Sequence, residues 1–530
     1  RDQLYNDLTA VEKQSYHLSK NAFSHDFASN FQTSLILHFI DDLEGKQPIL
    51  RSASSLQLDI WEKELKELVL KKQQFSKEYL LLKLRENTYK NIEKNRLGNA
   101  ITYRELQHQS TKKRQVWPIR KVIQNFSDEL FDLVPCWMAS PETVSAIFPL
   151  AKEPFFDLVI FDEASQCFAE KGLSAMLRGK QVVIAGDSQQ LQPSDIYRIK
   201  VEQDTEDNLL LEKESLLDLG ASLLPSTILR GHYRSKSLDL IDFSNKHFYN
   251  NKLKLLPNFL ELNDGTPGIT YIKVDGTWKD NQNQVEAQKV KDIILELRTK
   301  EPSKSIGVVT FNFQQAELIQ DLCPSINGLT IKNIENIQGD EFDILIFSIA
   351  YAPDEFGKIR MNFGSLSQKG GDNRLNVAIT RARENIKVVC SILPDQLQVE
   401  HTANKGPKLL QAYLTYAKNI SEGLFQASLP AIHPISWSRQ LKNELLKTDS
   451  NLSKALPFSD LVRHKDGKYG PLILTDDEQF YEAESLKESF AYLPKMLEDK
   501  GWKYQKVWSR NWWLKPASDF LLLEEKQGKV

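Results

Sequence analysis

Cysteine is scarce in this 530-residue sequence, which has four cysteines and no CxxC pair. No cluster of histidines accompanies them. This pattern excludes a disulfide-stabilised scaffold and a structural zinc site as the basis of the fold. We therefore expect free and mostly buried thiols in a reducing compartment, at Cys136, Cys167, Cys323 and Cys390.

Long apolar runs are also missing. No stretch approaches the 18 or more apolar residues that a membrane-spanning helix needs. The first residues, Arg1-Asp2-Gln3-Leu4, show no apolar signal region. The sequence therefore predicts a cytoplasmic protein that does not enter a membrane.

A global excess of one charge is absent as well, because the formal net charge is -3. Contacts to nucleic acid would have to come from local patches. Residues 71–121 form such a patch, with nine Lys and five Arg against four Glu. Apolar residues at helical spacing between Leu58 and Leu82 predict an amphipathic helix there. The basic stretch is either a solvated helix face or an arm that contacts phosphates.

The length exceeds what one hydrophobic core supports, so several domains are expected. Short apolar runs bounded by Gly, Asp and Pro begin near Phe156 and predict buried parallel strands at 158–161 and 182–185. A second set at 269–272, 306–309, 344–347 and 387–390 alternates with helical segments at 284–299 and 314–322. Alternating strands and helices predict an α/β fold with two doubly wound parallel sheets.

Two adjacent carboxylates, Asp162 and Glu163, directly follow the first predicted strand. Ligands bind at this edge of open parallel sheets. Nucleotide hydrolysis needs one carboxylate near magnesium and another that orients or deprotonates water, and this pair offers both. A solvated turn is the alternative for such a pair in isolation.

Four further segments follow in order and strengthen the nucleotide hypothesis. The second strand ends in Gly186-Asp187-Ser188-Gln189-Gln190, which places an amide four residues after the glycine. Two of the other three, Leu229–Ser235 and Asn373–Arg383, contain arginines. The third, Asn336–Asp343, contains a Gly-Asp-Glu run.

Together these five segments resemble motifs II to VI of superfamily 1 helicases. They are most similar to the 5′→3′ branch that contains the nonsense-mediated-decay helicase and the Okazaki-fragment nuclease-helicase. The resemblance covers roughly residues 130 to 395. It implies two RecA-like domains, a helical stalk insertion, a small α/β C-terminal domain, and activity as an ATP-dependent helicase on single-stranded DNA or RNA. The domain boundaries expected from it are 1–125 (stalk), 126–225 and 226–398 (RecA-like), 399–456 (linker) and 457–530 (C-terminal).

The resemblance assigns roles to individual residues. Asp162 would hold magnesium and Glu163 would act as general base. The amide of Gln190 would sense the γ-phosphate, and charge on the transferred phosphoryl group would be offset by two arginine fingers. A surface salt bridge is the alternative for each arginine. The two arginine fingers would be Arg234 and Arg381. Glu341 would contact the ribose of the nucleotide, and Gly339 would let the backbone approach it closely. Arg374 would lie near the phosphates.

Nucleic-acid contacts are assigned through a shorter segment, Val309–Gln315. It resembles the family's Thr-Pro-Tyr-x-x-Gln, although Phe311 and Asn312 replace the Pro and Tyr. Only Thr310 and Gln315 therefore carry the family's role of contacting the strand. Ser140, in the segment 135–141, is a further candidate phosphate contact, with a plain turn as its alternative.

The phosphate-cradling loop GxxxxGK[ST] is absent from these 530 residues. Each Gly-Lys pair is followed by a residue other than Ser or Thr, at Gln47, Gln181, Ile359, Tyr469 and Val530. The chain alone is therefore expected to hydrolyse ATP poorly. Because the family places this loop upstream of the stalk and the sequence begins with Arg, truncation is the favoured explanation over genuine loss. Genuine loss would leave a nucleic-acid-binding pseudo-ATPase.

The C-terminal segment resembles a very-short-patch-repair-like endonuclease domain. That family cuts DNA with magnesium-binding carboxylates, and Asp460 and Asp477 match two of them. Thr475 stands where the family has Glu, which predicts a degenerate nuclease, although an active site that uses Asp476 or Glu478 is the alternative. Clustered tryptophans at 502, 508, 512 and 513 are expected to form its core rather than to stack on bases.

Overall fold

A computed structural model describes residues 9–22, 27–51, 54–90, 92–93, 97, 101–193, 214–324, 326–359, 363–400, 402–425, 440–456 and 458–512. The chain divides into two compact units. The helical unit comprises Arg1–Phe75, Ala483–Leu493 and Val507–Val530, and the sheet unit comprises Ser76–Glu482 and Pro494–Lys506. In the part of the chain that the structure describes, every helix is too short or too polar to cross a membrane.

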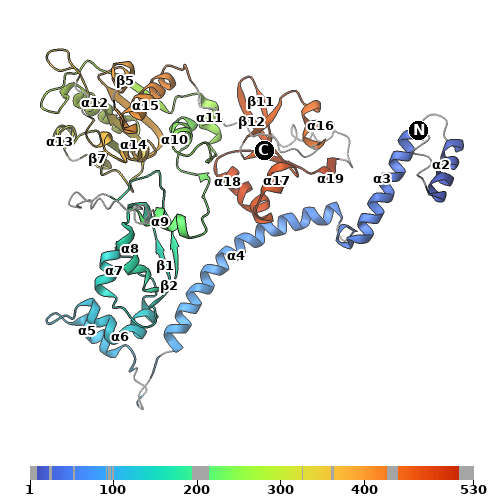
Figure 1. Ribbon diagram of the computed structural model, residues 1–530, viewed down its shortest axis with the longest axis horizontal. Coiled ribbons are helices and arrows are strands. Elements are labelled where there is room, and N and C mark those ends of the chain that lie inside the picture. The colour runs from blue at the N-terminus through green and yellow to red at the C-terminus, as the bar shows by residue number, and fades with distance from the viewer. Residues whose placement is uncertain are drawn as a thin grey trace, which may run out of the picture. The chain divides into compact units, whose positions relative to one another are not determined.

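Helices dominate the N-terminal region, as the sequence predicts. They are α2 (Ala10–Ala22), α3 (Phe27–Lys46), a 3-10 turn (Pro48–Arg51) and the long α4 (Ser55–Lys90), which is blue in Figure 1. The helix expected between Leu58 and Leu82 is confirmed as part of α4. Its apolar stripe is largely exposed, however: 47% of Trp61, 58% of Leu68 and 62% of Phe75 remain accessible. Helices α5 (Arg104–Thr111), α6 (Ile119–Leu133) and α7 (Pro141–Ile147) follow in the sheet unit.

The larger sheet has five parallel strands in the order β5-β9-β8-β6-β7. They are β5 (Ile269–Lys273), β6 (Ile306–Thr310), β7 (Leu329–Asn333), β8 (Phe342–Ser348) and β9 (Ala382–Cys390). Four of them match the predicted second set of strands, and β7 is additional. The predicted helices correspond to α12 (Gln284–Lys300) and α13 (Phe313–Leu322), shown in green in Figure 1.

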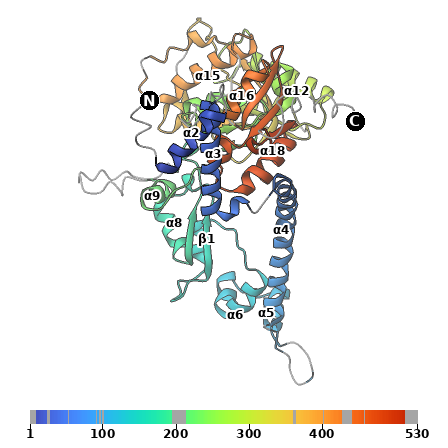
Figure 2. The ribbon, with the colours of Figure 1, turned by 90° about the vertical axis from the view of Figure 1, so that its right-hand side faces the viewer.

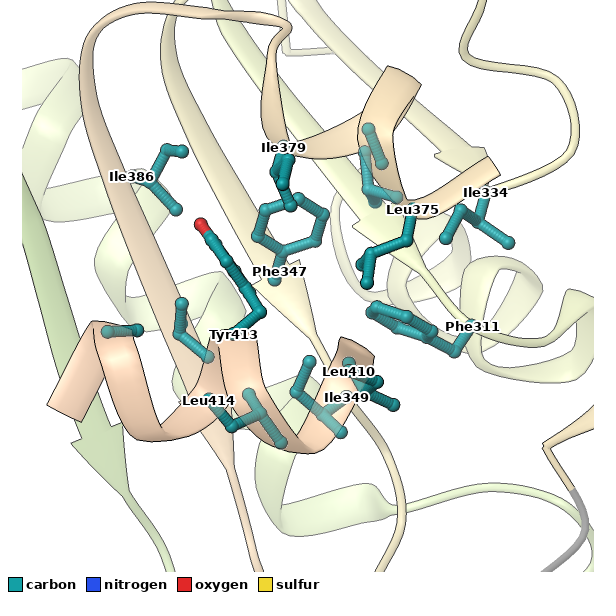
Figure 3. Packing of buried hydrophobic residues seen from close by; sticks show 14 of the residues in the cluster. Phe311, Ile334, Phe347, Ile349, Leu375, Ile379, Ile386, Leu410, Tyr413 and Leu414 are labelled. Atoms are coloured by element: carbon teal, nitrogen blue, oxygen red, sulfur yellow. The ribbon is translucent and has the colours of Figure 1, made fainter. Parts of the chain in front are cut away.

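Helices cover both faces of this sheet. Apolar side chains of α12 and α13 pack on one face, against residues such as Ile306, Val308 and Ile344. On the other face lie α14 (Gly371–Ile379) and α15 (Lys405–Ser421). Figure 3 shows this second core, in which Leu410, Tyr413 and Leu414 of α15 meet strand and helix residues including Phe347, Leu375, Ile379 and Ile386. The doubly wound arrangement is confirmed for this sheet.

Helix α15 falls inside the interval 399–456, which the sequence suggested as a linker. Leu410 and Leu414 are fully buried in the sheet's core. The domain built on the larger sheet therefore continues past residue 398. The polar residues that dominate this interval concealed an apolar face that only becomes visible at helical spacing.

The smaller sheet contains β1 (Phe156–Phe161) and β2 (Gly179–Ile184), which pair in parallel as predicted. Helices α8 (Ala169–Met176) and α9 (Leu216–Leu223) lie beside them in both views (Figures 1 and 2). Phe161, Val159 and Ile184 pack in the core with these helices. The expectation that both strands are buried is wrong for the opposite face, where Ile160 is 63% and Val183 is 48% exposed. The elements described here cover only one face of this sheet.

A third sheet, with the order β10-β11-β12-β13, forms the C-terminal region. Its strands are β10 (Leu452–Leu456), β11 (Ser459–Lys465), β12 (Lys468–Thr475) and β13 (Tyr504–Val507), and the first three are antiparallel neighbours. Helix α16 (Gln440–Thr448) packs on β10, and α17 (Glu478–Glu482) packs on β11 and β12. Two further helices of this part of the sequence are α18 (Leu493–Asp499) and α19 (Ser509–Trp512). Trp502, Trp508 and Trp512 are buried, as predicted for core residues; Trp513 lies outside the described residues.

All four cysteines are free thiols, as the sequence predicts. Cys323 and Cys390 are buried in the cores of the larger sheet, whereas Cys136 is exposed. The expectation of buried thiols is therefore wrong for Cys136, which lies in an irregular segment before α7 rather than in a strand or a core helix.

Candidate nucleotide site

The loop after β1 holds the two adjacent carboxylates in a constrained backbone. Glu163 adopts φ 52° and ψ 40°, the left-handed region that non-glycine residues rarely occupy. Its amide donates to Asp162 Oδ1 at 3.0 Å, and Ala164 N–H donates to Ala185 O at 2.9 Å, which ties the loop to the end of β2. A Cβ atom at Gly186 would lie 3.0 Å from Ala164 N, so this close approach of the two loops favours glycine. Strain of this kind gathers at functional sites.

Asp187 accepts several hydrogen bonds in the segment that follows β2. Its carboxylate accepts hydrogen bonds from Gln189 N–H (2.9 Å), from Gln190 Nε2 (3.0 Å) and from the Tyr249 hydroxyl (2.7 Å). Burial and the neighbouring Asp187 charge raise the pKa of Tyr249. The phenol therefore stays a hydrogen-bond donor at physiological pH, and it fixes the carboxylate that orients Gln190.

Two asparagines of helix α14, which packs on the larger sheet, donate hydrogen bonds to backbone carbonyls of this same segment. Asn373 Nδ2 donates to the carbonyls of Ser188 (3.1 Å) and Gln190 (2.8 Å). Asn376 Nδ2 donates to the carbonyl of Gln189 (2.8 Å) and to the Tyr249 hydroxyl (3.1 Å). The residue expected to sense the γ-phosphate is thus coupled to the larger sheet by direct contacts.

The two predicted arginine fingers lie at this junction. Arg381 is 4% exposed; its Nε donates to Val377 O at 2.8 Å and its guanidinium reaches Gln190 Oε1 at 3.4 Å. Burial, with the nearby charge of Arg234, lowers the pKa of Arg381 to about 10, and the charge of Glu163 acts in the opposite direction. Arg381 is therefore still protonated at neutral pH, and it lies within electrostatic range of both Glu163 and Arg234.

Glu341 binds two arginines in this structure. Arg234 Nε donates to Glu341 Oε2 at 3.1 Å, and Arg383 donates to Oε1 of the same carboxylate. These contacts lower the pKa of Glu341, with the Arg383 hydrogen bond as the larger cause. The sequence assigned Glu341 to the nucleotide ribose; in the structure both of its oxygens are occupied by guanidinium groups, and its observed effect is to hold Arg234.

The other two residues predicted for the nucleotide site, Gly339 and Arg374, have fewer contacts in this structure. Gly339 is exposed, with φ +84°, a conformation that favours glycine. Arg374 lies on α14, one residue after Asn373, and its guanidinium donates to Lys369 O at 3.4 Å. Of the described contacts of Arg374, none joins it to Glu163, Gln190 or the two fingers. The structure therefore places Glu163, Gln190, Arg234 and Arg381 close to one another, whereas Arg374 makes no described contact with these four residues.

Two residues that were predicted to contact the nucleic-acid strand, Thr310 and Gln315, have fully buried side chains. Thr310 is fully buried and its hydroxyl donates to Asn312 O at 2.7 Å. Gln315 is also fully buried and donates to Asn283 O (3.1 Å) and Ser348 Oγ (3.0 Å). In this conformation both side chains serve the fold, whereas Phe313 at the start of α13 is 58% accessible.

Ser140 is exposed and caps a helix. Its hydroxyl accepts a hydrogen bond from Thr143 N–H at 3.2 Å at the start of α7. A Ser followed by Pro at the first helical position is a common signal for a helix start. The structure thus gives Ser140 a local role, and its contact with a phosphate stays a prediction.

Within the basic stretch, an aromatic ring lies between two lysines. Lys121 Nζ is 4.1 Å and Lys112 Nζ is 5.7 Å from the centre of the Trp117 ring. Each contact is a cation–π interaction worth roughly 0.5–1 kcal/mol at an exposed site. The charge of this region is visible in the sequence, but the pairing of Trp117 with these lysines is not, because it depends on how α6 meets the loop before it.

His232, two residues before Arg234, predicts a specific pH dependence of stability. Ser235 N–H donates to His232 Nε2 at 3.0 Å, and burial together with Arg234 and Lys500 lowers the pKa of His232 to about 4. Between pH 6.5 and 4 the unfolded chain binds a proton that the folded chain does not, so stability falls as pH falls through this window. Relative to pH 7, we expect a loss of about 2 kcal/mol at pH 5 from this group, measured by urea unfolding.

The control for this prediction is His232→Gln, which keeps an acceptor that does not titrate. Its unfolding free energy should lose about 2 kcal/mol less than the parent between pH 7 and pH 5. Parallel pH curves for the two proteins would contradict the assignment.

The C-terminal carboxylates converge on one threonine. Thr475 N–H donates to Asp460 Oδ2 (2.9 Å), and its hydroxyl donates to Asp477 Oδ2 (3.2 Å). Burial raises the pKa of both carboxyls. Asp460 is 1% exposed, so its carboxylate is almost completely buried. Among the described residues, however, no group of three or more His, Cys, Asp or Glu could hold a metal ion.

The sequence of this chain is similar to several known proteins. Two family models, each described as an AAA domain, match residues 16–196 and 212–393. A protein of Mycoplasma pneumoniae called an uncharacterized ATP-dependent helicase MG140 homolog is 30% identical over 432 residues, which is 73% of this chain and 38% of that protein. The Mycoplasma genitalium helicase MG140 is also 30% identical, over 75% of this chain and 39% of its own length. Both relatives carry the name of an ATP-dependent helicase.

The chain spans about two fifths of the length of these relatives. Among solved structures, the arterivirus nonstructural protein 10 helicase matches 44% of this chain and 38% of its own, at 16% identity and a TM-score of 0.23. The structure itself shows a mixed α/β arrangement with parallel sheets.

Proposed function

We propose that this chain supplies the hydrolytic cleft and strand-engaging surface of an ATP-dependent helicase or translocase of the 5′→3′ branch. The observation that carries the proposal is the convergence of four side chains from two sheets. Glu163 and Gln190 follow β1 and β2, whereas Arg234 and Arg381 come from segments around the larger sheet. Arg381 contacts Gln190 directly. Such a set matches what phosphoryl transfer needs, namely an oriented base and cations that offset phosphoryl charge.

The proposed chemistry is attack of water on the γ-phosphorus. The water oxygen forms the new P–O bond, the bond to the β-phosphate breaks, and the water proton passes to the Glu163 carboxylate. Arg234 and Arg381 offset the negative charge on the phosphoryl oxygens. Asp162 is exposed and carries a carboxylate of the kind that magnesium prefers, and a bound magnesium ion would neutralise charge on the phosphates.

The coupling to a nucleic-acid strand follows from the contacts of α14 with residues 188–190. A change at Gln190 on hydrolysis would be passed to the larger sheet through Asn373 and Asn376. Opening and closing of the two sheets would then move the strand. Because backbone phosphates dominate such binding, affinity should fall as salt rises.

The test is ATP hydrolysis by this chain, with and without single-stranded DNA or RNA, beside a strand-binding assay. Because the 530 residues contain no GxxxxGK[ST] loop, the expected result is strand binding without hydrolysis. Strand-stimulated hydrolysis in the natural full-length polypeptide would then support the helicase proposal. A full-length protein that binds strands but never hydrolyses ATP would favour the pseudo-ATPase alternative.

A second candidate function, a magnesium-dependent nuclease, is favoured by the convergence of Asp460 and Asp477 on Thr475. If that site cuts DNA, Asp477→Ala should remove cleavage in magnesium or manganese while strand binding is kept. Asp466→Ala, on an exposed turn of the same sheet, is the matched control. Failure of the parent chain to cut any DNA with either ion would exclude this function.

A further inference from the structure

Gln338 contacts the residue proposed as general base. Its Nε2 donates to Glu163 Oε2 at 3.1 Å, across 175 residues of sequence. Glu163 is an acceptor when ionised, so this orientation of the amide is the one that its chemistry requires. The contact joins the loop between β7 and β8 of the larger sheet to the loop after β1.

The backbone around Gln338 is well anchored. Ile337, immediately before it, is fully buried in the core of the larger sheet. Gly339, immediately after it, takes φ +84°, which turns the chain sharply at this point. An anchored residue on one side and a glycine turn on the other fix where the amide lies relative to the sheet.

Glu163 has few other restraints on its side chain. It is exposed, its backbone is in the left-handed region, and among the described residues Gln338 supplies the one side-chain hydrogen bond to its carboxylate. A glutamate in this setting has several rotamers, and a general base must be held within hydrogen-bond reach of the proton it removes. The loop geometry alone therefore does not fix the base.

We infer that Gln338 is a positioning residue for Glu163, so that the base is correctly oriented only when the larger sheet contacts the loop after β1. This inference rests on the proposed ATPase function and names a further residue for that reaction. It also gives a physical reason for coupling: separation of the two sheets would break the contact and release the Glu163 side chain.

The second atom of the same amide is consistent with this role. Gln338 Oε1 is buried and accepts no hydrogen bond from the described residues. An amide that donates to a carboxylate through nitrogen presents its oxygen as an acceptor nearby. Because solvent does not reach this oxygen in the structure, the amide acts on Glu163 through its nitrogen.

The test uses the natural full-length polypeptide and measures strand-stimulated ATP turnover, ATP affinity and melting temperature. For Gln338→Ala we expect kcat to fall about 10- to 100-fold, the size of effect that a hydrogen bond to a charged group gives. KM for ATP, the dissociation constant of a fluorescent ADP and the melting temperature should stay within experimental scatter of the parent. Gln338→Glu, which has the same shape but no donor when ionised, should lose at least as much.

Gln288→Ala is the matched control. Gln288 Nε2 also donates to a carboxylate, Asp292 Oδ1 at 3.0 Å, but on the exposed side of α12. Its loss removes an equivalent hydrogen bond away from the cleft and should leave kcat unchanged.

A double-mutant cycle separates positioning from a purely structural role. In a Glu163→Asp background, whose shorter side chain no longer reaches the amide, Gln338→Ala should change kcat less than about twofold. Additive losses, or an unchanged kcat in the single Gln338→Ala and Gln338→Glu variants, would overturn the inference while the proposed function stands. A full-length parent without turnover would overturn the proposed function and this inference with it.

Discussion

Replacing Glu163 with glutamine is expected to lower ATP turnover in the natural full-length polypeptide by about 10²- to 10⁴-fold, the contribution typical of a general base. The glutamine keeps the size of the side chain and can still meet Gln338, but it cannot take a proton from water. Nucleotide and strand affinity should therefore persist, and the protein should accumulate with ATP bound. Phosphate release and filter binding of labelled ATP would measure the two effects separately.

Glu153→Gln is the matched control for this substitution. It makes the same change of charge at an exposed position shortly before β1. Turnover should remain at the parental value. If Glu163→Gln also hydrolysed ATP at that value, the assignment of the general base would be wrong.

Replacing Arg381 with alanine is expected to lower turnover by about 10³- to 10⁵-fold, the range found for arginine fingers. Two contacts explain why the effect should be large. The guanidinium is buried beside Gln190 and within electrostatic range of Glu163, so its charge is little screened by solvent. Arg381→Lys should recover little, because an ammonium cannot reproduce the planar set of donors that contacts Val377 and Gln190 together.

The control for Arg381 is Arg298→Ala on α12. Arg298 also donates to backbone carbonyls, those of Pro302 and Lys304, but it belongs to the outer helix layer. At a temperature where both variants remain folded, a large loss of turnover is expected for Arg381→Ala and not for Arg298→Ala. Equal turnover of Arg381→Ala and the parent would remove Arg381 from the proposed mechanism.

Sequence patterns predicted much of the larger sheet because its strands are buried on both faces. Such strands read as continuous apolar runs, and four of them were located in this way together with helices α12 and α13. The same rule misled at β1 and β2, whose apolar residues also run continuously although Ile160 and Val183 are exposed. Helix α15 escaped notice because polar residues separate its buried positions.

The residues alone singled out Asp162 and Glu163, because two adjacent carboxylates directly follow an apolar strand. The roles proposed for Gln190, Arg234 and Arg381 came instead from the resemblance to superfamily 1 helicases, and they stay predictions. Arg383 and Asn376 lie inside a recognised segment, but nothing in the sequence distinguished their roles. Tyr249 gave no signal at all, because a tyrosine at the end of a helical segment is more often a packing residue.

The sequence alone therefore determined which polar side chains follow the strands, because residue type and position after a strand are local properties. It also determined that the phosphate loop is absent from these 530 residues. Only the tertiary structure decided which side chains meet. Three sets of hydrogen bonds join segments between 40 and 190 residues apart. They are the bond between Gln338 and Glu163, the bonds from Asn373 and Asn376 to residues 188–190, and the bonds from two arginines to Glu341. Those contacts depend on how strands order themselves in a sheet, which no local pattern encodes.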